Sequence, residues 1–124
     1  MVGLFSRMVV GMTIRMPRWF VGWVSRRYVA GPTLADATKV MQRLSKEGAC
    51  FTIDVLGEEI TTMDEATFFL EEYKRVITAI TDNSLDANLS IKPTAFGLLL
   101  DSEKGMENIE ALVTIANSHN MFVR

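Results

Sequence analysis

The sequence predicts an α/β fold in which parallel strands alternate with helices. Runs of apolar, β-prone residues begin near positions 49, 87 and 121, and segments with helical periodicity lie between them. Successive runs are about one βα unit apart, a spacing typical of parallel strands joined by crossover helices. With 124 residues, of which 48% are hydrophobic and 23% charged, the chain has the composition of one globular domain.

A break at Gly31-Pro32 divides the sequence into an N-terminal arm, residues 1–32, and a second region, residues 33–124. We expect the arm to be helical, because apolar side chains recur in it at helical spacing. These side chains are Leu4, Met8 and Met12. The arm contains five arginines and no acidic residue, so a mitochondrial transit peptide is the alternative interpretation. No run of about 20 apolar residues is present, and the sequence therefore predicts no transmembrane helix.

The composition excludes several kinds of site and partner. The net charge is −2, and the acidic residues all follow the basic arm, which argues against nucleic acid as the main partner. One cysteine, Cys50, and one histidine, His119, cannot form an intrachain disulfide or a metal centre built from Cys or His side chains. We expect no metal site, and we expect Cys50 to be a small buried apolar residue.

Three helices are expected after the arm. Thr33 begins the first, over residues 33–47, because its spacing to the next carboxylate fits a capping box. A second capping box, formed by Thr62 and Glu65, begins the helix with the clearest apolar periodicity. Its apolar stripe comprises Ala66, Phe69, Leu70, Tyr73, Val76, Ile77 and Ile80. The third helix covers about residues 102–117, with a buried face expected at Met106, Ile109, Val113 and Ala116.

Three strands are expected, at residues 49–56, 87–92 and 121–123. The first is apolar on both faces, which is typical of a strand buried inside a parallel sheet. Two βα units and a short third strand cannot close a (β/α)8 barrel, which needs at least ~200 residues. The chain is therefore either a small open α/β domain or the beginning of a larger fold, and the apolar first strand favours the larger fold.

Candidate functional residues follow the strands, because parallel α/β folds place their active sites at the carboxyl ends of the strands. This rule selects Asp54 and Glu58 after the first strand and Lys92 after the second. A lysine at this edge can pair with a substrate carboxylate or a cofactor, and an aspartate between apolar neighbours needs a partner. The alternatives are a strand-end lysine that snorkels to water, an aspartate that bonds the next loop, and a solvated glutamate.

Three segments carry a resemblance to a known family: Arg26-Arg27-Tyr28-Val29-Ala30-Gly31, Asp54-Val55-Leu56-Gly57-Glu58 and Ser90-Ile91-Lys92-Pro93-Thr94. In order and spacing they resemble the N-terminal part of bacterial proline dehydrogenases. The resemblance implies a distorted (β/α)8 TIM-type barrel, here incomplete, preceded by a helical arm. It also implies oxidation of L-proline to 1-pyrroline-5-carboxylate by hydride transfer to FAD, in proline catabolism to glutamate, with quinone as the electron acceptor.

The same resemblance implies roles for the three candidate residues. Lys92 resembles the lysine that holds the substrate near the flavin, and Asp54 resembles the active-site aspartate of the first strand. Glu58 resembles the acid that closes the site by pairing with an arginine on a late helix. Most of the FAD-binding residues are expected beyond residue 124, so we expect the chain alone to bind no FAD and to be inactive. The alternative is a non-catalytic α/β remnant or interaction module without flavin.

Location and assembly follow as expectations. The resemblance implies a cytoplasmic protein, with peripheral contact at the inner face of the membrane as a further expectation, or a mitochondrial one in a eukaryote. An incomplete sheet leaves its edges exposed, and exposed edges favour self-association.

Overall fold

The computed structural model describes residues 16–25 and 28–124. The chain forms two compact units, residues 1–36 and 37–124. The expected boundary between arm and second region at residues 32 and 33 remains a prediction. Several sequence predictions lie outside the described residues: the helical spacing of Leu4, Met8 and Met12, and the resemblance at Arg26 and Arg27.

The first unit contains a short helix, α2 (Arg18–Ser25), in which no residue is buried. Phe20 lies between two tryptophans, with its ring 5.8 Å from that of Trp19 and 6.2 Å from that of Trp23. Thr33 precedes the next helix, α3 (Leu34–Ser45), and its hydroxyl oxygen accepts a hydrogen bond from the backbone N–H of Asp36 at 3.2 Å. The predicted N-terminal cap at Thr33 is therefore confirmed.

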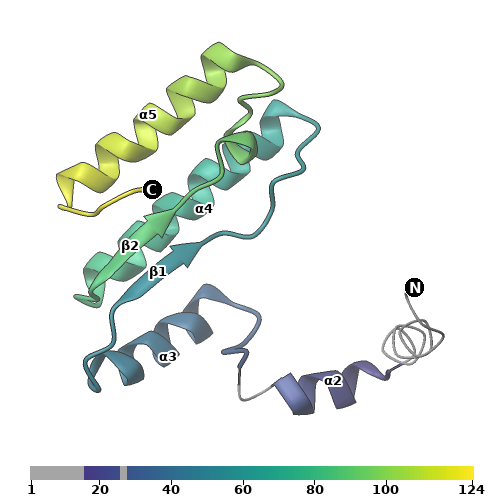
Figure 1. Cartoon of the computed structure of the whole chain (residues 1–124), viewed down its shortest axis with the longest axis vertical. Helices are drawn as coiled ribbons and strands as arrows, with labels where there is room; N and C mark the ends of the chain where they lie inside the picture. The colour runs from purple at the N-terminus through teal and green to yellow at the C-terminus, as the bar shows by residue number, and fades with distance from the viewer. Residues whose placement is uncertain (1–15, 26–27) are drawn as a thin grey trace, which may run out of the picture. The chain divides into compact units, whose positions relative to one another are not determined.

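The second unit contains a small parallel sheet (Figure 1). Its strands are β1 (Phe51–Asp54) and β2 (Ala87–Ser90), paired in a register that places Asp54 opposite Ser90. The predicted third strand is reduced to one parallel bridge, between Leu89 and Val123. The α/β class and the parallel pairing are confirmed. The described residues do not form a barrel, so the barrel remains a proposal.

Helix α4 (Met63–Asp82) begins at the predicted capping box. The hydroxyl of Thr62 accepts from the backbone N–H of Glu65 at 3.3 Å, and the Glu65 carboxylate accepts from the N–H of Thr62 at 3.0 Å. Six of the seven residues of the predicted stripe are buried, and the seventh, Phe69, is half-buried. Burial of a large apolar side chain stabilises the fold by roughly 1.5–3 kcal/mol, and the stripe supplies six of the thirteen buried apolar residues among those described.

The predicted buried face of the third helix, α5 (Ser102–Ser118), is partly wrong. Met106 and Val113 are exposed, whereas Gly105 and Leu112 are buried together with Ala116. The cause is a close backbone approach: a Cβ atom on Gly105 would lie 2.6 Å from the backbone nitrogen of Leu98. The spacing of large apolar residues does not reveal a glycine that packs through its backbone.

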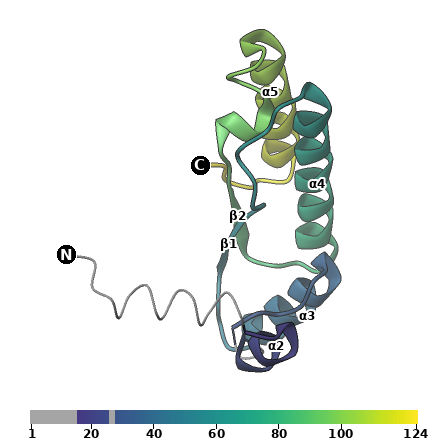
Figure 2. The ribbon, with the colours of Figure 1, turned by 90° about the vertical axis from the view of Figure 1, so that its right-hand side faces the viewer.

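Both α4 and α5 lie on one side of the two strands (Figure 2). The other side of the strand pair is not covered by these helices, and Thr52 of β1 is exposed. Within the described residues, β1 is therefore not buried on both faces. The prediction that Cys50 is buried is wrong, because its side chain is exposed next to the start of β1.

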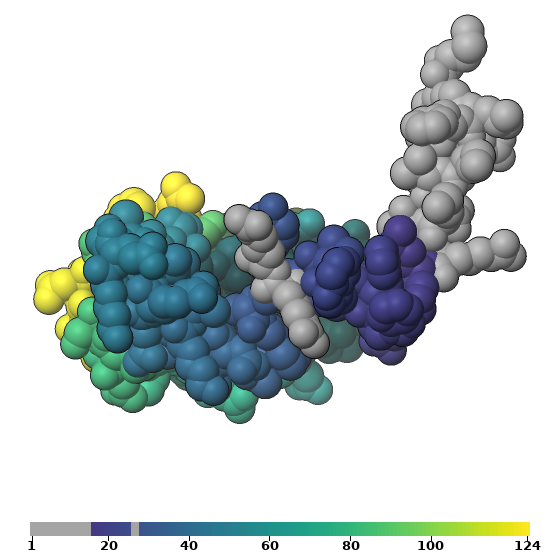
Figure 3. Space-filling model, turned by 90° about the horizontal axis from the view of Figure 1, so that it is seen from below, coloured from purple at the N-terminus to yellow at the C-terminus, as the bar shows by residue number. Residues whose placement is uncertain are grey.

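The chain end also lies at the surface. Yellow atoms of the C-terminal part are visible at the edge of the space-filling view (Figure 3), and Phe122 is 66% exposed. Among the described residues, no helix has the length and apolar character needed to cross a bilayer.

Candidate functional site

The carboxyl ends of β1 and β2 bring together the three residues that the sequence predicted. The parallel register aligns the last residues of the two strands, Asp54 and Ser90. Two residues further on, Lys92 precedes the 3-10 turn η1 (Pro93–Phe96) in extended conformation. Its ammonium Nζ lies 2.9 Å from Oδ2 of Asp54, and both side chains are about one-third exposed. Strand pairing therefore assembles an ion pair between residues far apart in the sequence.

Glu58 extends this cluster from the loop after β1. Its Oε2 lies 3.9 Å from Nζ of Lys92, and its side chain is 59% exposed. The preceding Gly57 has φ of +136°, and a Cβ atom there would collide with the ring of Phe69. Only glycine lets the backbone pass this close to Phe69 without strain. Gly57 therefore allows the loop to run alongside α4 and to place Glu58 near Lys92. We call Asp54, Glu58 and Lys92 the strand-end cluster.

The electrostatics of the cluster favour a charged lysine. The hydrogen bond to Asp54 is the main cause that raises the pKa of Lys92 above that of an ordinary lysine. Partial desolvation opposes this shift, and the charges of Asp54 and Glu58 add to it. The ammonium group is therefore present as a cation at neutral pH, available to a ligand carboxylate.

Tyr73 is a member of the site that sequence reasoning assigned only to the core. It projects from α4, is 1% exposed, and its hydroxyl group lies between the ends of the two strands. The hydroxyl is 2.7 Å from the carbonyl oxygen of Ser90 and 3.2 Å from Oδ1 of Asp54. It also accepts a hydrogen bond from the backbone N–H of Val55 at 3.2 Å. A tyrosine in an otherwise aliphatic stripe was the available signal, because a buried phenol needs a polar partner.

Burial raises the pKa of Tyr73 to about 12, with the backbone N–H of Val55 opposing this rise and the carboxylate of Asp54 adding to it. The hydroxyl is therefore protonated at neutral pH and can donate a hydrogen bond. It has one proton and two acceptors within reach, the Ser90 carbonyl and the Asp54 carboxylate.

The arrangement can bind an anion but does not by itself provide for catalysis or for a large cofactor. One cation, Lys92, faces two carboxylates across a partly open surface, so an incoming carboxylate competes with Asp54 for the ammonium. A flavin dinucleotide carries a pyrophosphate, and the acidic balance of the strand-end cluster does not fit that charge. Within residues 16–25 and 28–124, no group of three or more His, Cys, Asp or Glu side chains could hold a metal ion.

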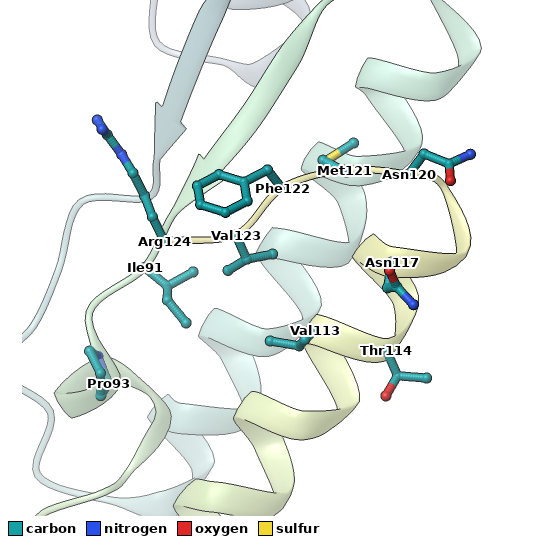
Figure 4. Close-up of a pocket in the computed structure, with 10 residues that line it drawn as sticks. All are labelled: Ile91, Pro93, Val113, Thr114, Asn117, Asn120, Met121, Phe122, Val123 and Arg124. Carbon is teal, nitrogen blue, oxygen red and sulfur yellow. The ribbon is translucent and has the colours of Figure 1, made fainter.

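An open groove of the described surface lies beside the cluster, not at it. It has a volume of about 870 Å³ and runs between the end of β2, α5 and the last residues of the chain. Figure 4 shows Ile91, Val113 and Val123 along this groove, whereas the guanidinium of Arg124 points away from it. Arg124 is the one titratable residue of its lining. The lining of the groove is mainly apolar, whereas the strand-end cluster carries the charged candidate residues.

Comparison with known proteins adds an independent observation. No protein-family model matches the chain. The chain is 39% identical over 99 residues to proline dehydrogenase 1 of Bacillus subtilis subsp. natto, and the match covers 80% of this chain and 33% of that protein. Proline dehydrogenase 2 of Bacillus subtilis strain 168 is 28% identical over 105 residues, covering 82% of this chain and 35% of that protein. Proline dehydrogenase of Deinococcus radiodurans is 25% identical over 103 residues, covering 81% and 33%.

These relatives agree with the family suggested by the three sequence segments. The chain spans about a third of the length of the curated relatives that it matches. Over that shared third, the chain is homologous to the proline dehydrogenases.

Proposed function

We propose that the chain supplies the first βα units of a proline dehydrogenase barrel, an oxidoreductase that converts L-proline to 1-pyrroline-5-carboxylate. The observation that supports this most strongly is the ion pair of Lys92 and Asp54 at the carboxyl ends of two parallel strands. This is the edge at which parallel α/β folds bind their substrates. The relatives named proline dehydrogenase supply the substrate class.

In this proposal, Lys92 binds the carboxylate of L-proline. Asp54 and Glu58 hold the ammonium of Lys92 between them, so the cation is charged and oriented at the strand ends. Such pre-positioning lowers the cost of ordering a flexible lysine on binding. Glu58 is the more exposed of the two acids, which suits its proposed role of closing the site by pairing with an arginine outside this chain.

FAD as hydride acceptor, and quinone as the final electron acceptor, belong to the proposal through the family resemblance alone. The strand-end cluster offers a single cation and does not fit a pyrophosphate, so the flavin site is assigned to the part of the enzyme that lies outside this chain. The chain alone is accordingly proposed to be inactive and flavin-free. A cytoplasmic location, with peripheral contact at a membrane that contains quinone, completes the proposal.

The test is a chimera in which this chain replaces the matching third of Bacillus subtilis proline dehydrogenase 1. Proline-dependent reduction of a redox dye by the purified, flavin-loaded chimera is the expected result, and the isolated chain should show neither flavin absorbance nor dye reduction. A chimera that binds flavin but does not oxidise proline would contradict the proposal. That outcome would favour a non-catalytic module instead.

A further inference from the structure

We propose that Tyr73 is a positioning residue, whose buried hydroxyl fixes the carboxylate of Asp54 so that Oδ2 faces Lys92. Tyr73 lies on α4, whereas the residues it positions lie at the ends of the sheet. The proposal deepens the function proposed above, but it rests on the geometry of the chain and not on any activity.

The hydroxyl of Tyr73 is held in place from several directions. Its ring is buried and packs on the ring of Phe96, with centroids 5.5 Å apart and planes inclined by 33°. The N–H of Val55 donates to the hydroxyl oxygen, and the carbonyl of Ser90 lies 2.7 Å away. These contacts tie one side chain of the helix to the carboxyl ends of both strands.

Asp54 divides its two oxygens between two partners. Oδ1 lies 3.2 Å from the Tyr73 hydroxyl, and Oδ2 lies 2.9 Å from the ammonium of Lys92. A partly exposed ion pair gains little free energy, because two flexible side chains must be ordered and water screens their charges. The contact between Tyr73 and Oδ1 restricts the rotation of the carboxylate. Forming the ion pair with Lys92 therefore costs less conformational entropy.

The hydrogen bonds of the hydroxyl can also change when a ligand binds, because its one proton has two acceptors within reach. The single hydroxyl proton is shared between the Ser90 carbonyl, at 2.7 Å, and Oδ1 of Asp54, at 3.2 Å, so Tyr73 donates to Asp54 while Lys92 is paired with it. When a ligand carboxylate draws the lysine away, Asp54 loses its cation and becomes the stronger acceptor. The shared proton then moves closer to Oδ1, which limits the cost of leaving that carboxylate without its lysine.

The experiment is a substitution cycle on this chain, read by ¹³C NMR titration of the Lys92 side chain. Tyr73→Phe keeps the ring and removes the hydroxyl, and it should lower the pKa of Lys92 towards that of an ordinary lysine. In the Asp54→Asn background, where the ion pair is already absent, the same substitution should leave the Lys92 titration unchanged. A purely structural effect of Tyr73 would appear in both backgrounds.

Two results of this titration would overturn the proposal: a Lys92 curve that Tyr73→Phe leaves unchanged, or one that it shifts equally in both backgrounds. Tyr28→Phe is the matched control, because Tyr28 is 86% exposed and belongs to the other compact unit. It should leave the Lys92 titration unchanged. Should Tyr73→Phe fail to fold, side-chain coupling constants of Asp54 in the Lys92→Met chain decide the question, because the ion pair is absent there and Tyr73 still contacts the carboxylate. One fixed χ1 rotamer is expected, and rotamer averaging would contradict the role of Tyr73. Neither measurement involves proline or flavin, so failure here is distinct from failure of the proposed function.

Discussion

Lys92 and Asp54 are 38 residues apart in the sequence, yet Nζ of the lysine lies 2.9 Å from Oδ2 of the aspartate. The pairing of β1 with β2 creates this proximity, because parallel strands that begin in register also end in register. The ion pair is therefore a consequence of the fold, and it places a partly exposed cation at the carboxyl ends of the strands.

The first prediction concerns stability at alkaline pH. Lys92 and Tyr73 both have a pKa that is raised in the folded chain, from 10.5 for the lysine and from 10.0 to about 12 for the tyrosine. Groups of this kind stabilise the fold fully below their unfolded pKa, and the stabilisation is lost as the pH rises through the folded pKa. The unfolding free energy should therefore fall between about pH 10 and pH 12.

Asp54→Asn tests this cause, because Asp54 contributes to both shifts. Urea unfolding from pH 8 to 12 should show a smaller alkaline loss for this variant than for the unmodified chain. Glu107→Gln, an exposed acid on α5, serves as the control and should retain the full loss. Equal pH slopes for all three proteins would refute the assignment.

The second prediction concerns the capping box of α4. Thr62→Ala removes the hydroxyl that accepts from the N–H of Glu65 and should cost about 1 kcal/mol of unfolding free energy. Thr67→Ala is the matched control, since its hydroxyl only bonds back to the carbonyl of Met63 within the helix. Denaturant unfolding at pH 7 should show little loss for Thr67→Ala; a similar loss for both variants would argue against the cap.

The same box predicts a loss of stability in acid. Hydrogen bonds from the backbone N–H groups of Thr61 and Thr62 are the main causes that lower the pKa of Glu65. Its contribution is present above the usual glutamate value of 4.5 and is lost as the pH falls through the lower folded pKa. Denaturant unfolding repeated from pH 7 down into the acid range should show a smaller loss of unfolding free energy for Glu65→Gln than for the unmodified chain. An equal loss in both proteins would contradict this role of Glu65.

The third prediction concerns Gly105, which is buried in α5 where the sequence predicted that Met106 would be buried. Gly105→Ala adds a Cβ that would lie 2.6 Å from the backbone nitrogen of Leu98, and the strain should destabilise the chain by about 1–3 kcal/mol. This outweighs the gain of up to ~1 kcal/mol that alanine normally brings to a helix. Gly22→Ala in α2 meets no atom within 4 Å and should not destabilise the chain. Comparable thermal shifts for the two variants would remove the packing argument.

The sequence predicts most of the helices and the location of the cluster for physical reasons that are local. The capping box and apolar stripe of α4 lie within one element, so spacing alone identifies its start and its buried face. The strand-end rule likewise selects Asp54, Glu58 and Lys92, because carboxyl ends of parallel strands share one edge.

What the sequence does not predict depends on contacts between elements. The buried face of α5 is set by the approach of Gly105 to Leu98, which no periodicity of large residues reveals. The hydrogen bonds of Tyr73 at the strand ends depend on where α4 passes these ends. The position of Tyr73 in the apolar stripe indicates only that it is buried.

The measurement that tests the proposed substrate site most directly is the proline oxidation rate of the flavin-loaded chimera with Lys92→Met. A charge-assisted hydrogen bond contributes about 1.5–3 kcal/mol, so kcat/KM for L-proline should fall by about 10- to 100-fold. Lys104→Met, on the exposed first turn of α5, is the matched control and should retain the unmodified rate. An unchanged kcat/KM in the Lys92→Met chimera would contradict the claim that the strand-end cluster binds the substrate carboxylate.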